Sequence, residues 1–357
     1  MPLDLPLSER EPPPIPPVET RSKRRQRPAT LEPGMRIGVW RVERELGSGG
    51  MATVYAVVHT RFGKRAALKL AHRTALGWGF TPETFLREAR TANLIDHPGV
   101  AEVFATGIYD GRPYLAMELL SGRSLGALLD GAMPRDEALD ILLELCDVLA
   151  AAHAAGVTHR DLKLDNVLLL DTPGADGNRT KLLDWGMARI AGEADPLRDL
   201  IAGTLTYVAP EQVRGEDITP AADIYALAVL TYRLLLGEPP FASPNDLELL
   251  QLHLHAPPPR PCTLWSAIPR ELEATLLAML AKQPEDRPGL PEIVRVLAST
   301  RARLRPSPLR RRELPGGPPR HAGRPSLPWF ATKQQRVAGA ALGLALTVAS
   351  LLQLLGA

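Results

Sequence analysis

Apolar and polar positions follow two different patterns along the chain. From residue 40 to residue 119 they alternate over short segments, which is the period of half-buried β-strands. One helical segment interrupts them after Thr81, where Pro82 and Glu83 suit the first turn of a helix. The expected strands cover residues 41–46, 53–57, 66–70, 100–104 and 114–119. The first part of the chain is therefore predicted to be a β-sheet with one helix.

Helical spacing dominates the second part. Residues 136–155 carry apolar side chains at mixed helical spacings, as in a largely buried helix, and Gly156 supplies its end. A hairpin is expected where residues 167–170 and 180–183 flank a loop rich in Gly, Asp and Asn. Further helices are predicted after Thr219-Pro220 and over residues 245–255, 270–282 and 290–303. Together the two patterns predict an α+β fold.

The 35 prolines gather near the two ends of the chain, where no hydrophobic period is present. Residues 1–34 are Pro-rich with a basic cluster at 21–27, and residues 304–336 are rich in Pro, Gly and Arg. Such segments cannot bury enough apolar surface to offset the entropy of ordering. Both are predicted to be disordered, which leaves one folded domain at residues 35–303.

Residues 337–357 form a segment without a charge, about as long as a helix that crosses a bilayer. Lys333 and Arg336 precede it, and basic flanks stay on the cytoplasmic side of a membrane. We therefore expect a single-pass protein of the cell or inner membrane with a cytoplasmic domain, although a docking helix or an unstructured end is an alternative. Gly339 and Gly343 form a G-x-x-x-G pattern, which is compatible with a homodimer.

Charge is distributed unevenly along the chain. Residues 35–300 hold 26 Lys and Arg against 34 Asp and Glu, whereas residues 301–336 hold 10 against one. No nucleic-acid partner is expected for an acidic domain, and the cluster at 21–27 is interpreted as a solvated tail rather than a site for nucleic acid or anionic lipid. The two cysteines, neither in a C-x-x-C motif, predict no disulfide or zinc site and indicate a reducing compartment.

Residues 159–166, His-Arg-Asp-Leu-Lys-Leu-Asp-Asn, combine the groups that phosphoryl transfer needs. They lie on a loop, because a predicted helix precedes them and a short apolar run follows. Asp161 can accept a proton from a hydroxyl group, Lys163 can neutralise a phosphate, and Asn166 offers a side-chain oxygen to Mg²⁺.

Other segments add to this set. Glycines at residues 47–50 separate two strands and let backbone N–H groups approach phosphate oxygens, although a plain hairpin turn explains the pattern about as well. Lys69 stands among apolar residues of a predicted strand. Asp184-Trp185-Gly186 follows the hairpin, 18 residues after Asn166.

In this order and spacing, the motifs resemble those of eukaryotic-like (Hanks-type) serine/threonine protein kinases, and of their bacterial branch in particular. Residues 159–166 match H-R-D-L-x-x-x-N, residues 47–54 resemble G-x-G-x-x-G-x-V, and residues 203–211 end in Ala-Pro-Glu. The resemblance covers roughly residues 37–303. It implies a bilobal protein kinase fold, with a small β-rich lobe at about 37–118 and a large, mainly helical lobe at about 122–303.

The resemblance also implies a signalling enzyme that transfers the γ-phosphoryl group of Mg-ATP to Ser/Thr hydroxyls of proteins. Asp161 would accept the hydroxyl proton, and Lys163 would offset charge on the γ-phosphoryl group and favours Ser/Thr over Tyr specificity. Lys69 would hold the α- and β-phosphates with Glu88 as its partner. Glu83 is a weaker candidate for that partner, because helix capping explains it.

Two further sets of roles follow from the resemblance. Asn166 and Asp184 would bind Mg²⁺. The other candidates for ATP binding are Leu46, Gly47, Ser48, Gly49, Gly50, Val54, Ala67, Met117, Glu118 and Leu120.

Asp223 would brace the catalytic loop, although it could instead serve the helix dipole. A pair between Glu211 and Arg287 would be structural.

The chain departs from the family pattern at three places. Ala52 replaces the third glycine, Trp185 replaces Phe, and no Ser, Thr or Tyr lies between Gly186 and Gly203. Arg160, which in the family grips a phosphate on this segment, is nevertheless present. We hypothesise that a carboxylate from Glu193, Asp195 or Asp199 takes the place of the phosphate. The alternative is an unpaired Arg160 and a mobile segment.

Two other functions compete with protein phosphorylation. Ala52, Trp185 and the segment without phosphorylation sites are compatible with a pseudokinase, a binding or scaffold module of the same fold. The complete set Lys69, Asp161, Asn166 and Asp184 weighs against it. A small-molecule phosphotransferase shares the core chemistry but usually lacks the Ala-Pro-Glu segment and the helix that carries Asp223.

Overall fold

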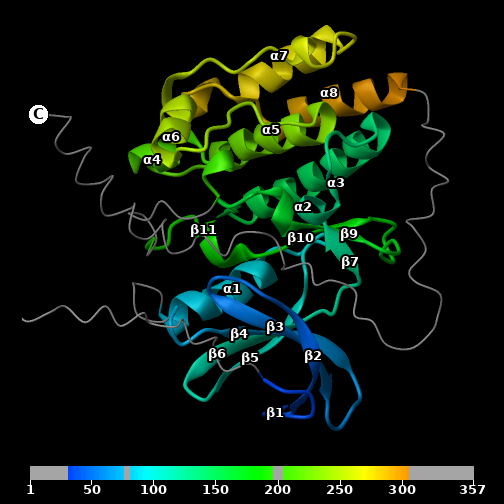
Figure 1. Ribbon diagram of the computed structural model, residues 1–357, viewed down its shortest axis with the longest axis vertical. Coiled ribbons are helices and arrows are strands. Elements are labelled where there is room, and N and C mark those ends of the chain that lie inside the picture. Colours follow the sequence, from blue (N-terminus) through cyan, green and yellow to red (C-terminus); the bar gives the residue numbers. More distant parts are fainter. Residues whose placement is uncertain (1–30, 76–80, 196–203, 305–357) are drawn as a thin grey trace, which may run out of the picture. The chain divides into compact units, whose positions relative to one another are not determined.

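The computed structural model describes residues 31–75, 81–195 and 204–304, and these residues form two lobes (Figure 1). The first lobe is built on a six-stranded antiparallel sheet with strand order β1-β2-β3-β4-β6-β5. Its elements are β1 (Arg36–Ile37), β2 (Trp40–Ser48), β3 (Ala52–His59), β4 (Arg65–Ala71), α1 (Pro82–Leu94), β5 (Val103–Tyr109) and β6 (Arg112–Met117). Helix α1 packs against β5 and β6.

Alternation of side chains along the strands gives this sheet two apolar faces. The outer face carries a buried cluster formed by Leu31, Ile37, Trp40, Val42, Tyr55, Val57, Ala66, Leu68, Leu70 and Ala116. The opposite face carries a smaller cluster formed by Leu46, Val54, Ala56 and Ala67. Lys69 stands opposite Val54 in the β3–β4 register, so it belongs to the face of the smaller cluster.

Helix α1 begins as the sequence predicts. The Thr81 hydroxyl accepts a hydrogen bond from the backbone N–H of Thr84 at 3.2 Å, and Pro82 occupies the first turn. The buried face of the helix carries Phe85 and Ala89, and Glu88 lies on the same face. Glu88 is therefore directed into the protein.

The second lobe is mainly helical. Its longest helices, α3 (Arg135–Ala154) and α5 (Ala221–Leu236), pack against each other, and α8 (Leu290–Arg303) packs on α3. The other helices are α2 (Leu125–Leu128), α4 (Pro210–Arg214), α6 (Asp246–His255) and α7 (Arg270–Met279). Nearly all of α5 is buried, which explains its continuous apolar sequence.

Short strands between the helices carry the loops of interest. β7 (Gly122–Ser124), β9 (Val167–Leu170) and β10 (Thr180–Leu182) form an antiparallel sheet, and β9 and β10 are the predicted hairpin. β8 (Val157–Thr158) pairs with β11 (Arg189–Ile190). Gly156 has a φ of 73°, a conformation that glycine adopts without strain, and it turns the chain from α3 into β8.

Some predicted boundaries are wrong. The strand expected at 100–104 is β5, which begins at Val103 and runs to Tyr109, because the N–H of Val100 is used in a turn to the carbonyl of His97. The outer half of β5 is half-buried or exposed and therefore lacks the apolar signal. Helix α7 ends at Met279, three residues before the expected end. The N–H groups of Leu280 and Ala281 there donate to carbonyls three residues back, of Leu277 and Ala278, instead of four residues back as in an α-helix.

The predicted folded domain extends further toward the N-terminus. Leu31 is buried in the outer cluster, and its N–H donates to the hydroxyl of Tyr55 at 3.2 Å. This contact lies four residues before the expected boundary at residue 35. Residues 1–30, the linker after residue 304 and the predicted span at 337–357 lie outside the described residues. Within the described ranges, no helix is both long enough and apolar enough to cross a bilayer.

Candidate active site

The loop at residues 159–166 lies between β8 and β9, as its sequence position predicts. The backbone N–H groups of His159 and Arg160 both donate to the carboxylate of Asp223, each at 2.9 Å. Asp223 is fully buried in the first turn of α5, where it also contacts Nε2 of His153 at 2.8 Å. Burial alone would raise the pKa of Asp223, but these hydrogen bonds and neighbouring charges lower it. An ionised carboxylate thus fixes the loop, as the resemblance implies.

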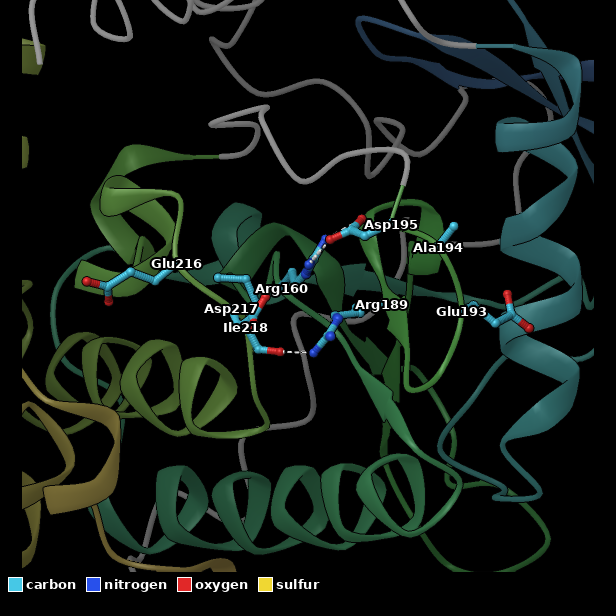
Figure 2. A pocket seen from close by; sticks show the side chains of 8 residues that line it. All are labelled: Arg160, Arg189, Glu193, Ala194, Asp195, Glu216, Asp217 and Ile218. Atoms are coloured by element: carbon cyan, nitrogen blue, oxygen red, sulfur yellow. Dashed lines mark hydrogen bonds and ion pairs between the residues drawn. The ribbon is translucent and has the colours of Figure 1, made fainter. Parts of the chain in front are cut away.

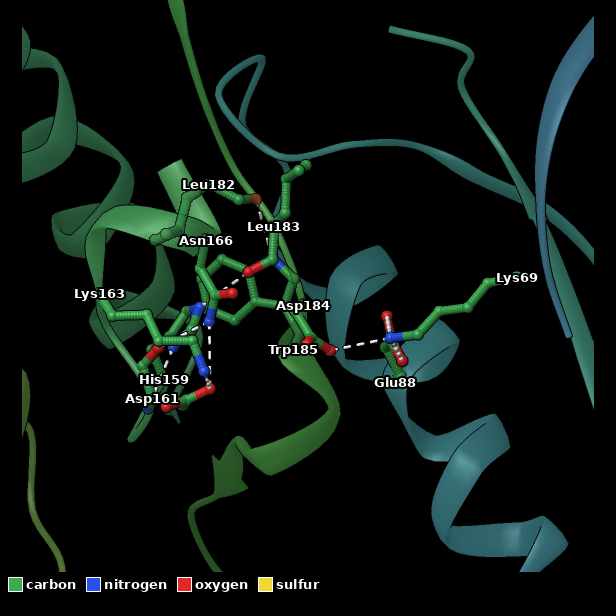
Figure 3. Close-up of polar contacts among 10 residues, drawn as sticks. All are labelled: Lys69, Glu88, His159, Asp161, Lys163, Asn166, Leu182, Leu183, Asp184 and Trp185. Carbon is green, nitrogen blue, oxygen red and sulfur yellow. Dashed lines mark hydrogen bonds and ion pairs between the residues drawn. The ribbon is translucent and has the colours of Figure 1, made fainter. Parts of the chain in front are cut away.

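Asp161, Lys163 and Asn166 meet at one point of this loop (Figure 3). The ammonium group of Lys163 contacts the carboxylate of Asp161 directly. The side-chain amide of Asn166 donates to the carbonyl of Asp161 at 2.8 Å and to its carboxylate at 3.2 Å. Burial would lower the pKa of Lys163, but the charge of Asp161 raises it, so Lys163 stays a cation. The three side chains are therefore arranged as the sequence predicts.

A second group of charges joins the two lobes. Nζ of Lys69, on β4, lies 2.8 and 2.7 Å from the two carboxylate oxygens of Glu88 and 2.8 Å from Oδ1 of Asp184. Figure 3 shows Lys69 between the two carboxylates. The predicted contact between Lys69 and Glu88 is thus present. Glu83 lies in the exposed first turn of α1 and makes no such pair.

Burial and charge act in opposite directions on this group. Burial alone would lower the pKa of Lys69, but the two carboxylates raise it well above its usual range. Burial raises the pKa of Glu88 to about 7, against the effect of Lys69. Burial would also raise the pKa of Asp184, but Lys69 lowers it to about 2. Asp184 is therefore the carboxylate that remains ionised over the widest range of pH.

Trp185 fills the place that Phe has in the resembling family. It is buried, its ring centroid lies 4.6 Å from that of His159, and its indole N–H donates to the carbonyl of Leu182 at 3.3 Å. The backbone at Asp184 has a φ of 64°, a strained conformation for a residue with a side chain. Packing of Trp185 on the catalytic loop helps to hold Asp184 in this conformation.

Asn166 and Asp184 are suited to a divalent cation. The amide nitrogen of Asn166 is directed to Asp161, so the oxygen of the same amide is the atom left for a ligand. The N–H of Leu183, next to Asp184, donates to the backbone carbonyl of Asn166 at 2.8 Å, which ties the two residues together. Amide and ionised carboxylate oxygens are ligands that Mg²⁺ prefers.

The apolar residues predicted to bind the nucleotide are only partly brought together. Leu46, Val54 and Ala67 lie in one buried cluster, and Met117 packs on it. Leu120 was expected to contribute its backbone groups, and its side chain packs on a different cluster, near the β9–β10 hairpin. The N–H of Glu118 already donates to the carbonyl of Glu102 at 2.9 Å, so this N–H is not available to a base.

The glycine-rich segment is the turn between β2 and β3. The N–H of Gly49 donates to the carbonyl of Ala52 at 2.9 Å, which closes the turn. The methyl group of Ala52, in place of the third glycine, is buried in the main core cluster, to which Ala71 and Phe85 also belong. Ala52 therefore adds to packing inside the lobe.

Arg160 is paired with a carboxylate, as hypothesised, and the partner is Asp195. The two side chains form a double contact in which Nη1 of Arg160 lies 3.0 Å from Oδ1 of Asp195. Glu193 is directed to α1 instead, where it contacts Arg90 at 2.6 Å and Arg87 at 3.5 Å. Asp199 lies outside the described residues.

A cavity of about 330 Å³ beside this pair is lined by Arg160, Arg189, Glu193, Ala194, Asp195, Glu216, Asp217 and Ile218 (Figure 2).

The predicted pair of Glu211 and Arg287 is present and buried. Nη1 and Nη2 of Arg287 lie 2.6 and 2.7 Å from the two carboxylate oxygens of Glu211. Both side chains are almost completely excluded from solvent. The pair links α4, at the end of the segment after Gly203, to the loop that precedes α8.

Sequence reasoning missed several residues that support the site. Gln212 donates from its amide to the carbonyl of Arg160 at 3.0 Å, and Lys181 contacts Glu118 at 2.8 Å. Leu119 packs on the apolar cluster near Met117. Gln212 follows the Ala-Pro-Glu motif directly, so its position was the one available signal.

With this geometry established, comparison with known proteins identifies the family. The protein kinase domain family matches residues 40–297, which is most of the chain. The fold and the site agree with this family, because the chain has two lobes and Lys69 of the first lobe contacts Asp184 of the second. The chain belongs to the protein kinase family.

Among curated proteins, the chain is similar to bacterial members of this family. It is 39% identical to serine/threonine-protein kinase Pkn1 of Myxococcus xanthus over 256 residues, 71% of this chain and 37% of that protein. It is 35% identical to serine/threonine-protein kinase PknA of Mycobacterium tuberculosis over 259 residues, 70% of this chain and 58% of that protein. The match thus covers little more than a third of Pkn1 and less than two thirds of PknA.

Proposed function

We propose that this chain is a serine/threonine protein kinase, which transfers the γ-phosphoryl group of ATP to hydroxyl groups of proteins. The observation that carries the proposal is the meeting of two charged groups, Lys69 with Glu88 and Asp184 from one side, and Asp161 with Lys163 and Asn166 from the other. Its relatives are named serine/threonine-protein kinases, which supports the same conclusion.

Each group has a defined task in this proposal. Lys69, held by Glu88, binds the α- and β-phosphates and is positioned before the nucleotide arrives. Asp161 orients the acceptor hydroxyl and takes its proton, and Lys163 offsets the charge that develops on the γ-phosphoryl group. The protein contributes mainly positioning and preorganised charge, because the transition state of phosphoryl transfer is loose.

Asn166 and Asp184 would hold the divalent cation, which we propose to be Mg²⁺. When bound, the cation would neutralise charge on the phosphate oxygens. Asp184 contributes an ionised carboxylate, because Lys69 lowers its pKa to about 2. Lys69 contacts Asp184 directly in the structure, and binding of the nucleotide would draw this ammonium group toward the phosphates.

The nucleotide base would lie on the apolar cluster of Leu46, Val54 and Ala67, with Met117 beside it. Because the N–H of Glu118 is already bonded, its carbonyl is the group proposed to accept from the base. The glycine-rich segment from Gly47 to Gly50 would cover the phosphates.

Serine and threonine are the proposed acceptors, because Lys163 follows Asp161 by two residues as in Ser/Thr-specific members of the family. A pseudokinase would need at least one essential group to be absent or turned away. The contacts of Lys69 and Asp161 give no support to that alternative.

We also propose that residues 337–357 anchor the chain in the cell membrane, with the kinase domain in the cytoplasm and a role in signalling. The absence of charges in this segment and the basic residues before it support the anchor. Gly339 and Gly343 would allow two such helices to associate as a homodimer.

The experiment that tests the proposed activity is incubation of the full chain with labelled ATP, Mg²⁺ and a mixed protein acceptor. Hydrolysis of the labelled product should yield phosphoserine and phosphothreonine, and chelation of the metal should abolish the label. Label found only on tyrosine, or transferred only to small molecules, would overturn the assignment.

A further inference from the structure

A chain of side-chain hydrogen bonds lies directly behind the glycine-rich segment. Ser48 and Thr53 are paired across β2 and β3, and their hydroxyl oxygens are 3.0 Å apart. The Thr53 hydroxyl lies 2.8 Å from Nε2 of His72, and Nδ1 of the same ring lies 3.3 Å from the carbonyl oxygen of Gly50. Thr53 and His72 are each only 5% exposed. Four residues thus form one chain of hydrogen bonds, with its middle, Thr53 and His72, buried and its ends, Ser48 and Gly50, exposed at the turn.

The direction of these hydrogen bonds follows from the chemistry of their ends. The carbonyl of Gly50 can only accept, so Nδ1 of His72 carries the hydrogen. In the neutral ring Nε2 is then an acceptor, to which the Thr53 hydroxyl donates a hydrogen bond, and the Thr53 oxygen in turn accepts one from the Ser48 hydroxyl. Burial lowers the pKa of His72, and the nearby charge of Arg112 acts in the same direction, which favours this neutral form.

The backbone of His72 holds the same turn. Its N–H donates to the carbonyl of Met51 at 2.8 Å and so continues the β3–β4 ladder one step beyond Ala71. His72 therefore contacts two consecutive carbonyls, of Gly50 through its ring and of Met51 through its backbone. Both lie in the turn that contains the glycines.

His72 makes these contacts from the face of the sheet that is opposite to Lys69. Thr53 stands opposite Leu70 in the β3–β4 register, one position away from the Val54–Lys69 pair. Neighbouring positions in a strand face opposite sides. His72 follows Leu70 by two residues and contacts Thr53, so it lies behind the sheet and away from the reacting groups.

A turn with glycines at 47, 49 and 50 has little that limits its backbone. Glycine loses more conformational freedom on ordering than any other residue, so such a turn is costly to fix around a ligand. A hydrogen bond that fixes the Gly50 carbonyl in advance reduces this cost, and it engages a carbonyl rather than a backbone N–H group that could face phosphate oxygens.

We propose that His72 is a positioning residue for the nucleotide: its imidazole holds the glycine-rich segment over the phosphates of ATP. The inference rests on the proposed function, because it takes ATP as the ligand of this segment. It adds to that function a residue behind the sheet, fixed by Thr53 and Ser48.

The test separates the two ring nitrogens. In His72→Asn, the side-chain amide nitrogen takes the place of Nδ1 and can still donate to Gly50, whereas in His72→Gln the longer amide takes the place of Nε2 and reaches only Thr53. The KM for ATP, the KM for the protein acceptor and kcat are measured for both variants in the full chain. Loss of one hydrogen bond predicts a KM for ATP about 3- to 10-fold higher in His72→Gln. His72→Asn should restore most of the wild-type value, and the KM for the acceptor should be unchanged in both.

A second pair of variants protects the test against misfolding. Thr53→Val removes the hydroxyl that orients His72, and Thr53→Ser keeps it. If His72→Gln fails to fold in a thermal unfolding measurement, a higher KM for ATP in Thr53→Val but not in Thr53→Ser supports the proposal. Equal KM values for ATP in wild type, Thr53→Val and each folded His72 variant would overturn it.

Failure of the proposed function would be distinguishable. If the wild-type chain transfers no phosphate, the kinase assignment is wrong, whatever the variants do. The dissociation constant for Mg-ATP, measured by calorimetry, then replaces KM. Weaker binding in His72→Gln than in His72→Asn supports the role of His72, and equal binding contradicts it.

Discussion

Buried charges at single residues hold the candidate site together. The carboxylate of Asp223 accepts hydrogen bonds from the two N–H groups that shape the catalytic loop. The ammonium group of Lys69 donates hydrogen bonds to the carboxylates of both Glu88 and Asp184. A buried charge is tolerated only when it is paired and hydrogen-bonded. Removal of one member of such a pair therefore leaves the other as an unpaired buried charge, which destabilises the fold.

The pair of Glu211 and Arg287 gives the clearest prediction at this scale. Arg287→Ala leaves the Glu211 carboxylate buried without its partner, so the free energy of unfolding should fall by about 3–5 kcal/mol. Chemical denaturation measures it. Arg295→Ala is the matched control, because Arg295 pairs with Glu271 on the exposed surface and should cost less than about 1 kcal/mol. Similar losses in the two variants would contradict the account.

Sequence predicted some residues of the site better than others. Asp161, Lys163, Asn166, Lys69, Glu88 and Asp184 were found because motif and spacing fix them. The choice of Asp195 among three acids depends on how the loop folds in space. His72 and Thr53 gave no signal, because their contact crosses 19 residues of sequence and belongs to none of the family's motifs.

At the scale of elements, the segment after Gly186 is held by two acids. Glu193 contacts Arg87 and Arg90 of α1, and Asp195 contacts Arg160 of the catalytic loop. In other kinases a phosphate commonly makes such contacts. The described part of the segment, up to Asp195, therefore carries its own negative charge at the place of a phosphate.

We expect activity that needs no phosphate on this segment. Asp195→Asn removes a charge-assisted contact with Arg160 and should lower kcat about 10-fold. Glu216→Gln, which changes another acid beside the same cavity, should lower kcat less than about twofold. Treatment of the wild type with a phosphatase should leave kcat unchanged. A fall after phosphatase treatment, together with an unaffected Asp195→Asn, would show that a phosphate elsewhere is required.

The contact between His253 of α6 and Tyr225 of α5 predicts that the stability of the fold depends on pH. His253 of α6 is fully buried and contacts the Tyr225 hydroxyl at 2.9 Å. Burial and the charge of Lys282 lower its pKa to about 4. Between pH 6.5 and 4 the unfolded chain binds a proton at this residue and the folded chain does not, so stability is present above pH 6.5 and is lost as the pH falls.

Denaturation at pH 7.5 and pH 5 measures this effect. The free energy of unfolding of the wild type should fall between these values by about 2 kcal/mol more than that of His253→Gln, which cannot titrate. Equal losses in the two proteins would mean that His253 takes up its proton in the folded state as well.

The periodicity of the sequence predicted which segments are helices or strands, but it predicted where they begin and end less accurately. Helix α8 begins and ends as expected at Leu290 and Arg303, because its apolar positions repeat without interruption. Strand β5 was misplaced, because most of it is not buried and the buried residues just before it, Val100 and Ala101, are not part of a strand. Apolar residues in the sequence mark buried positions, and buried positions do not always belong to a helix or strand.

At the scale of the whole molecule, the protein kinase family accounts for residues 40–297. The anchor that we propose at 337–357 lies outside this match and is tested separately. A fusion that carries residues 326–357 should sediment with membranes after carbonate washing. Leu346→Arg places a charge near the middle of the span, at a cost of about 3 kcal/mol, and should release part of the fusion. A wild-type fusion that is wholly soluble would exclude the anchor.

The central claim is that Asp161 and the groups around it transfer phosphate, and one assay tests it directly. Full-length protein is incubated with Mg²⁺ and labelled ATP beside Asp161→Asn, with Asp176→Asn, in the exposed turn of the β9–β10 hairpin, as control. The account predicts transfer by the wild type and by Asp176→Asn, and loss of nearly all transfer in Asp161→Asn. Absence of transfer by the wild type, or equal transfer by all three proteins, would contradict it.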